Sequence, residues 1–220
     1  EDQQDYWHLT FRQDNYDLSK PVLMEYSQIG EDSRLIALDL QTGNLQEVAS
    51  VPEGYDIRRT NYTSQGNVVV LAVSEAGLWN GNYGQMMTHS PVGIQVLCFS
   101  PQGEALWTAN LTSYSYSTTH VLSTIEGRGE LFCQVDNVLA MIDENTGTVI
   151  SACETGATPV WTQMGKDSAT ILLEDGSMGM YYFDANEFNS TRYFKENIAQ
   201  AYVGKGVFLR QSYSSEILVY

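Results

Sequence analysis

Residue types that could perform acid–base chemistry are present in this sequence, but they form no recognisable catalytic motif. Three histidines, His8, His89 and His120, lie far apart in the chain, and each could act as a base. The 27 acidic residues could include the carboxylate pair that glycoside hydrolysis requires. Adjacent acids such as Glu31 and Asp32, however, fall in expected turns. The sequence therefore predicts no catalytic residue and leaves a carbohydrate-active enzyme as an alternative.

Metal ligands are equally sparse. Asp143, Asn145 and Gly147 have the spacing that opens a calcium loop, but the remaining ligand positions are missing and a hairpin turn explains the same residues. The three cysteines lack Cys-x-x-Cys spacing and each falls within an expected strand: Cys98, Cys133 and Cys153. We expect buried, unpaired thiols, and we predict no metal site and no cofactor.

The clearest functional pointer is a segment rich in aromatic residues and methionine, residues 74–91, which interrupts a regular succession of short strands. Such side chains suit a protein- or sugar-binding surface. If the strands are arranged as described below, one face gathers seven candidate binding residues: Trp79, Tyr83, Met86, Met87, His89, Tyr114 and Tyr116. The alternative is that the segment folds back and caps the molecule with its own aromatic side chains.

The elements that must position these residues belong to a cassette that recurs along the chain. In it, an apolar strand runs into a turn of the form Asp-x-x-Thr-Gly, and a second strand follows. Its copies occupy residues 35–43, 96–107, 138–147 and 180–186. Steps of 60, 44 and 41 residues separate the equivalent positions, Asp39, Phe99, Asp143 and Asp184. Repeats of roughly 40 to 50 residues with several short strands are typical of β-propeller blades.

The sequence therefore predicts an all-β fold, a β-propeller of about five four-stranded blades, in which residues 1–220 form a single domain or a propeller fragment. The expected strands are 6–11, 21–27, 34–40 and 44–51; 56–61, 67–73, 93–99 and 104–111; 118–124, 130–135, 137–142 and 148–154; 159–163, 168–173, 178–183 and 190–195; 198–203, 206–211 and 216–220. The fifth blade lacks its outer strand, which leaves an open edge. Three explanations remain: a larger propeller, a return of residues 6–11 to close the ring, or a second chain on the edge.

The cassette resembles the quinoprotein-like (PQQ-type) propeller repeat, whose consensus is roughly Ala-x-Asp-x-x-Thr-Gly-x-x-x-Trp. The first copy matches at Ala37, Asp39, Thr42 and Gly43, with Glu47 in place of the Trp. The later copies match at Asp143, Thr146 and Gly147, with Met141 for Ala and Ser151 for Trp, and at Gly103 and Trp107. In that family the Trp docks between neighbouring blades, so the resemblance implies that Trp107 packs between blades.

A second resemblance concerns residues 99–103, Phe-Ser-Pro-Gln-Gly, which are similar to the Phe-Ser-Pro-Asp-Gly of WD40 repeats. The chain has neither a Trp-Asp dipeptide nor a Gly-His dipeptide, so WD40 ranks second. Many quinoprotein-like relatives are cofactor-free scaffolds, among them outer-membrane assembly lipoproteins and sensor ectodomains. The resemblance therefore implies a propeller without bringing a quinone or calcium site with it.

Charge and composition restrict the partners. The net charge is −16, which repels nucleic-acid phosphates and anionic lipid, so we expect no nucleic-acid partner. No stretch of about 18 apolar residues occurs, so we expect no membrane insertion of this segment. The polar start at Glu1 is typical of a trimmed or mature N-terminus. A Tyr- and Gln-rich, Lys-poor composition favours an extracytoplasmic bacterial setting, whereas unpaired cysteines favour a cytoplasmic one.

Together these observations predict a non-catalytic binding or scaffold propeller, part of a larger bacterial protein. Its partner would be another protein or the remainder of its own chain, contacted through the aromatic face. Besides the carbohydrate-active enzyme, a sensor ectodomain with a small ligand in the central channel remains an alternative.

Overall fold

The chain folds into antiparallel sheets that follow one another in sequence. The computed structural model describes residues 7–11, 19–28, 33–74, 92–113, 120–194, 198–203, 207–211 and 217–219. These residues form strands, turns and short irregular stretches, and none of them lies in a helix. Accordingly, the described part of the chain contains no helix long and apolar enough to cross a membrane.

Each sheet is built from consecutive strands. The first holds β1 (Trp7–Phe11), β2 (Val22–Gln28), β3 (Arg34–Leu38) and β4 (Leu45–Ser50). The second holds β5 (Tyr55–Tyr62), β6 (Val68–Ser74), β7 (Val92–Phe99) and β8 (Ala105–Ser113). The third holds β9 (His120–Ile125), β10 (Glu130–Val135), β11 (Val138–Asp143) and β12 (Val149–Glu154). The fourth holds β13 (Pro159–Met164), β14 (Ser168–Leu173), β15 (Ser177–Tyr182) and β16 (Glu187–Arg192). The fifth holds β17 (Ile198–Val203), β18 (Val207–Gln211) and β19 (Ile217–Val219).

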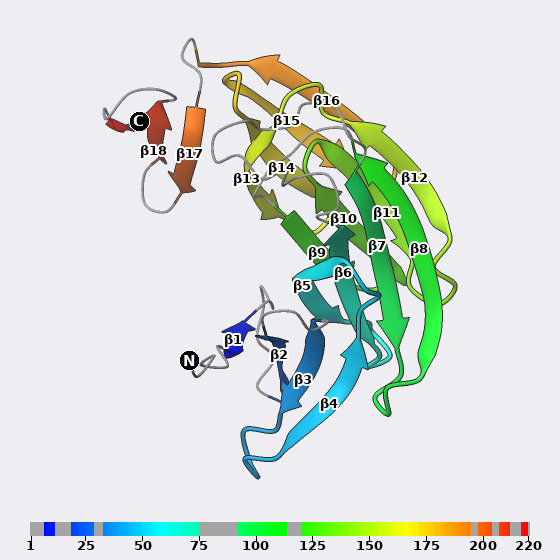
Figure 1. Ribbon diagram of the computed structural model, residues 1–220. Helices are drawn as coiled ribbons and strands as arrows, with labels where there is room; N and C mark the ends of the chain where they lie inside the picture. The colour runs from blue at the N-terminus through cyan, green and yellow to red at the C-terminus, as the bar shows by residue number, and fades with distance from the viewer. Residues whose placement is uncertain are drawn as a thin grey trace.

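The five sheets are arranged along an arc, with the first and fifth at its two ends (Figure 1). In the second to fourth sheets the first strand lies on the inner side of the arc and the last strand on the outer side (Figure 1). Sequential four-stranded sheets arranged radially in this way define a β-propeller. The described residues thus give four complete blades and a three-stranded fifth blade, as the cassette predicts.

The strand boundaries agree with the sequence prediction to about two residues, except for β16. That strand begins at Glu187 rather than 190, because the preceding turn closes between Tyr182 and Asn186: the Asn186 amide donates to the Tyr182 carbonyl at 2.9 Å. The Gly147 amide donates to the Asp143 carbonyl at the same distance. Tyr182, and not Asp184, is therefore the equivalent of Asp143. Asn186 takes the place of the glycine with a φ of 54°.

The start of the chain belongs to the first sheet. β1 pairs antiparallel with β2, and the fifth sheet contains β17, β18 and β19 alone among the described strands. The suggestion that residues 6–11 return to complete the fifth blade is therefore wrong.

The core consists of apolar layers between neighbouring sheets. Along β6, Val69 and Leu71 pack toward the third sheet, while Val68 and Val70 pack toward the first. This follows from the two-residue period of a strand, and it explains why β6 is apolar on both faces. Between the third and fourth sheets the core contains three buried aromatic rings, those of Phe132, Tyr181 and Phe183, with neighbouring ring centroids 5.6 to 6.2 Å apart.

All three cysteines are free, as predicted, but they are not equally buried. Cys98 and Cys133 lie in the core, where burial raises the pKa of the two thiols to about 11 and about 12. Cys153 is only half-buried, which corrects the expectation for that residue. It lies on β12, where alternate side chains face the solvent.

Trp107 joins the second blade to the third, as the resemblance implies. Its indole N–H donates to the Glu144 carbonyl at 3.0 Å, and its ring covers Gly147 so closely that a Cβ there would lie 2.5 Å from the ring. The buried Glu144 carboxylate also accepts the Ser64 amide at 3.0 Å and the Ser64 hydroxyl. The third blade therefore holds both the inner and the outer part of the second.

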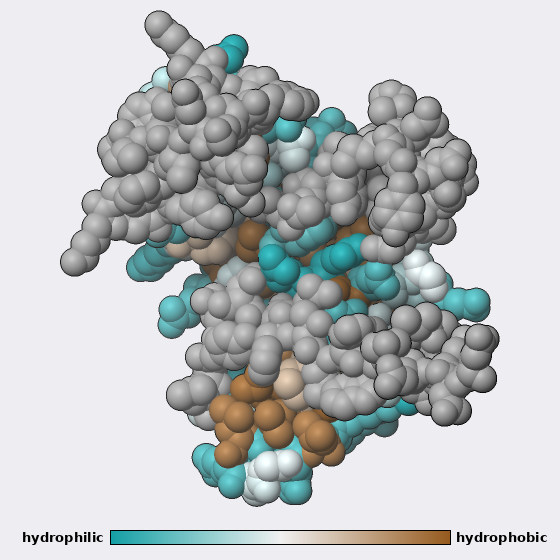
Figure 2. Space-filling view, turned by 60° about the vertical axis from the view of Figure 1, so that its left-hand side comes forward, coloured by the Kyte–Doolittle hydropathy of each residue, from teal (hydrophilic) through white to brown (hydrophobic). Residues whose placement is uncertain are grey.

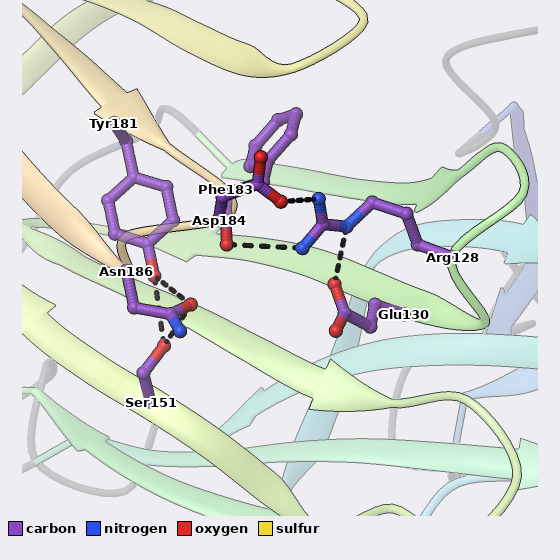
Figure 3. A network of polar contacts seen from close by, with 7 residues as sticks. All are labelled: Arg128, Glu130, Ser151, Tyr181, Phe183, Asp184 and Asn186. Atoms are coloured by element: carbon purple, nitrogen blue, oxygen red, sulfur yellow. Dashed lines mark hydrogen bonds and ion pairs between the residues drawn. The ribbon is translucent and has the colours of Figure 1, made fainter.

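A different network joins the third blade to the fourth (Figure 3). Ser151 occupies the position of Trp107, and its hydroxyl contacts the Tyr181 hydroxyl at 3.0 Å and the Asn186 amide oxygen at 2.9 Å. Nearby, the Arg128 guanidinium donates to Glu130 at 2.8 Å and to Asp184. These two bonds, that to Asp184 first, raise the pKa of Arg128. Polar groups here take the place of the aromatic contact.

Besides its apolar core, the contact between the first and second blades uses the backbone at its outer edge. A Cβ on Gly103 would lie 2.5 Å from the Val48 carbonyl oxygen, so the outer strand of the first blade lies directly on the glycine turn of the second. On the inner side, the Tyr62 hydroxyl donates to the Pro21 carbonyl at 2.9 Å, and the Lys20 ammonium lies 5.1 Å from the Tyr62 ring centroid.

Candidate functional site

Four strand ends define one face of the propeller, which we call the upper face. Register places Tyr55 opposite Ser74 and Val92 opposite Ser113. The Asn61 side chain bonds to the Leu122 carbonyl at 3.1 Å, and Thr124 bonds to the Tyr62 carbonyl at 2.6 Å, so β5 and β9 run in the same direction. The C-terminal ends of β6 and β8 and the N-terminal ends of β7 and β9 therefore lie on the same face.

The seven candidate binding residues lie in two segments that begin and end at this face. Residues 75–91 connect β6 to β7, and residues 114–119 connect β8 to β9. Both segments lie outside the described residues, and so do all seven candidates: Trp79, Tyr83, Met86, Met87, His89, Tyr114 and Tyr116. The described strand ends fix where the two segments attach.

Tyr55 helps to fix these attachment points. The expected strand begins at residue 56, and β5 begins one residue earlier, at Tyr55. The phenol crosses the sheet toward Gly93 near the start of β7, where a Cβ would lie 2.8 Å from the Tyr55 hydroxyl oxygen. Glycine at position 93 therefore permits this crossing, and the side chain packs against the core between the first two blades.

Charged groups follow on the same inner strand. The Asp56 carboxylate lies 3.6 Å from the Arg58 guanidinium, and their side chains are 43% and 21% exposed. The register of β5 shifts between Ile57 and Arg59, and Arg59 donates to the Arg58 carbonyl at 2.8 Å. A bulge changes the direction of the side chains next to it. In this acidic protein, two arginine residues thus lie in the middle of an inner strand.

His120 is the candidate base that the structure describes. It lies 8% exposed at the start of β9, with its Nε2 4.0 Å from a carboxylate oxygen of Asp136, which is 2% exposed. Asp136 occupies the turn between β10 and β11 with a φ of 52°. The side chain of His8, in β1, and all of His89 fall outside the description. Sequence analysis missed the pair, although the expected β9–β10 hairpin places His120 opposite Val135 and beside Asp136.

Three acidic side chains are buried among the described residues: Glu25, Asp136 and Glu144. Glu25 accepts the Ser33 hydroxyl at 3.0 Å, and Glu144 accepts the Ser64 amide. Asp136 precedes the six-residue β11 and Glu144 follows it. A strand of that length spans about 20 Å, beyond the 5–9.5 Å of glycoside hydrolysis. Within the described ranges, no group of three histidine, cysteine or acidic side chains could hold a metal ion.

Comparisons with known proteins identify the class of fold. No protein-family model and no curated protein matches the chain. A protein of unknown function from Bacteroides caccae has a TM-score of 0.51 at 12% identity, over 92% of this chain and 70% of that chain. BBS1N, crystallised in complex with ARL6DN, has a TM-score of 0.51 at 13% identity, over 90% of this chain and 60% of that one.

A third structure, BamB from Moraxella catarrhalis, has a TM-score of 0.48 at 13% identity, over 87% of this chain and 55% of that chain. This chain thus spans between 55% and 70% of the lengths of the three solved proteins. The radial succession of sheets establishes a β-propeller built of repeats, and the first two similarities extend to the fold alone.

Proposed function

We propose that this protein is a binding propeller that recognises a partner protein through its upper face. The observation that carries the proposal is the common attachment of residues 75–91 and 114–119 to one face of the propeller. The aromatic and methionine residues of these segments are of the kind that dominates protein interfaces. The crystallisation of BBS1N, a protein of similar fold, in complex with ARL6DN supports a protein as the partner.

We also propose that the blades are of the quinoprotein-like repeat type. The close packing of Trp107 on the glycine turn of the next blade supports this assignment, because the Trp of that repeat docks between neighbouring blades. The alternatives were a carbohydrate-active enzyme and a sensor of a small ligand. The described residues favour recognition of a partner, since each buried carboxylate already contacts a neighbouring serine or histidine.

The test is a double substitution on the proposed surface. A partner is first captured by cross-linking in an extract of the native organism and purified, and its affinity is then measured by calorimetry. We expect Trp79→Ala with Tyr83→Ala to weaken binding at least about tenfold, as loss of two aromatic anchors does. The matched control is Tyr182→Ala, an aromatic side chain 44% exposed at the end of β15, away from the upper face. Normal binding by the double variant would overturn the proposal.

A further inference from the structure

The contacts of the second, third and fourth blades with the blade that precedes each of them follow one rule. In each, the following blade supplies the turn between its third and fourth strands, and the outer strand of the preceding blade covers it. Gly103 receives the Val48 backbone, Gly147 receives the Trp107 ring, and Asn186 receives the Ser151 hydroxyl. The second, third and fourth blades therefore all have this turn covered.

The first blade carries the same turn. The Gly43 amide donates to the Asp39 carbonyl at 2.8 Å, as Gly147 does to Asp143 at 2.9 Å. The Asp39 carboxylate accepts the amides of Gln41 and Thr42, and the φ of Gly43 is 73°, against 70° for Gly147. No atom of the described residues lies within 4 Å of a Cβ built on Gly43. The turn that an aromatic ring covers in the third blade is thus left uncovered in the first by the residues that the structure describes.

An exposed apolar face continues from this turn. Along β3, Leu35 and Ala37 pack toward the second blade, so the alternate residues Ile36 and Leu38 face away from it. Leu45, the partner of Leu38 on β4, is 60% exposed, and Leu40 is 53% exposed. Figure 2 shows a hydrophobic patch at the bottom of the view, where the first blade lies. Apolar groups that gather on one face mark an interaction surface.

We propose that this outward face of the first blade is a docking surface for a further β-blade supplied from outside these 220 residues. The face consists of Ile36, Leu38, Leu40, Gly43 and Leu45. The occupant is a sheet whose outer strand places an aromatic side chain over Gly43, as Trp107 is placed over Gly147. An aromatic side chain is inferred because the turn at Gly43 has the hydrogen bonds and φ of the turn at Gly147, with open space above the glycine.

The test supplies such a blade. A copy of residues 51–119, the second blade with its connection, is placed ahead of residue 1 of the full chain. Leu45→Cys in the original chain reports on the face through its rate of maleimide labelling, read by mass spectrometry on its own peptide. We expect labelling to slow at least tenfold in the extended protein. Leu106→Cys in the original second blade, also on an outer strand and 48% exposed, is the matched control and labels equally in both proteins.

Two further variants test the aromatic contact itself. Trp107→Ser in the added copy and Gly43→Asn in the original chain each restore labelling to within threefold of the unextended protein. Gly127→Asn is the control for Gly43→Asn, because Gly127 has a φ of 76° with open space around it, and it leaves the protection intact. Asparagine is chosen because Asn186 adopts the same backbone region.

Two outcomes overturn the proposal. In one, the thiol introduced by Leu45→Cys labels as fast in the extended protein as in the original, which shows that the face does not fit a blade. In the other, the original chain sediments as a dimer that protects this introduced thiol, and Leu45→Lys dissociates the dimer, which makes a second copy the occupant.

Discussion

The contact between the second and third blades and that between the third and fourth use the same position in different ways. Trp107 lies on a glycine, whereas Ser151 meets an asparagine. Both turns need a residue with positive φ, which is 70° at Gly147 and 54° at Asn186. The size of the side chain on the preceding strand thus matches the residue at the turn. The propeller keeps the turn geometry and lets the chemistry of the contact vary.

We expect the largest effect from a substitution that disrupts the contact between Trp107 and Gly147. Gly147→Ala adds a Cβ 2.5 Å from the Trp107 ring at a φ of 70°, so it combines backbone strain with overpacking. We expect a loss of about 3 kcal/mol in the free energy of unfolding, measured by urea denaturation. The control Gly127→Ala has similar strain but open space, and we expect a loss of about 1–2 kcal/mol. Equal losses would show that Trp107 is not tightly packed on the glycine.

A double-mutant cycle would convert one contact into the other. Ser151→Trp alone places an indole against Asn186 and Tyr181, and we expect it to cost about 2 kcal/mol. Combined with Asn186→Gly, it recreates the pair found one blade earlier. We expect the double variant to be more stable than the sum of the single effects by about 1 kcal/mol in urea denaturation. Strict additivity would mean that the two positions are not matched to each other.

The ion pairs of the polar contact have a smaller effect. Arg128→Met removes the bonds to Glu130 and Asp184, but Asp184 is 83% exposed and its pairing is screened by solvent. We expect a loss of about 0.5–1 kcal/mol in low salt, and less in about 1 M salt. Arg192→Met is the control, since its guanidinium bonds to the Phe194 carbonyl near the end of its own blade. A loss that salt leaves unchanged would contradict the electrostatic account.

The smallest expected effect is a pH dependence of stability that distinguishes the Asp143 turn of the third blade from the equivalent turn of the fourth. The Thr146 amide, then its hydroxyl and the Asn145 amide, lower the pKa of Asp143 below 3.8. A lowered pKa stabilises the fold at pH values above 3.8, and this stabilisation is lost as pH falls through the folded-state pKa. We expect Asp143→Ala to cost below about 0.5 kcal/mol at neutral pH, because the carboxylate is exposed, and less in acid.

The equivalent residue in the fourth blade provides the control for that measurement. Tyr182 contributes its carbonyl to the turn, so Tyr182→Ala should show the same stability difference from the parent in mild acid, above the pKa of Asp143, and in strong acid, below it. A parallel acid dependence in both variants would trace the effect to other groups.

Most of the fold follows from the cassette, because its strands alternate with turns that demand particular residues. Gly43 and Gly147 mark their turns plainly. Sequence analysis misplaced the turn of the fourth blade for two reasons. Asn186 adopts the positive φ that a glycine has in the other turns, and Asp184 is an acidic residue two positions after Tyr182, the true start of the turn. The contact of the Val48 backbone with Gly103 could not be predicted, since any residue type at position 48 supplies the same carbonyl group.

The candidate site was less accessible to sequence analysis. The alternation of apolar residues in the flanking strands predicts where residues 75–91 attach. The long connection itself has no such alternation, so its sequence does not predict where its side chains lie. The approach of His120 to Asp136 could have been predicted from the hairpin register, which places Val135 opposite His120. The other neighbours of a buried side chain depend on how blades pack, which no local pattern encodes.

Glu144 has a consequence for how the molecule comes apart. Its carbonyl holds the outer strand of the second blade through Trp107, and its carboxylate holds the inner turn of that blade through Ser64. In repeat proteins, stability is the sum of terms for each unit and for each pair of neighbours. We therefore expect the interaction between the second and third blades to make them one cooperative unit, and the sheets at the ends of the arc to open more readily. Amide hydrogen exchange should therefore be slowest in β6, β7, β10 and β11 and faster toward both ends of the chain.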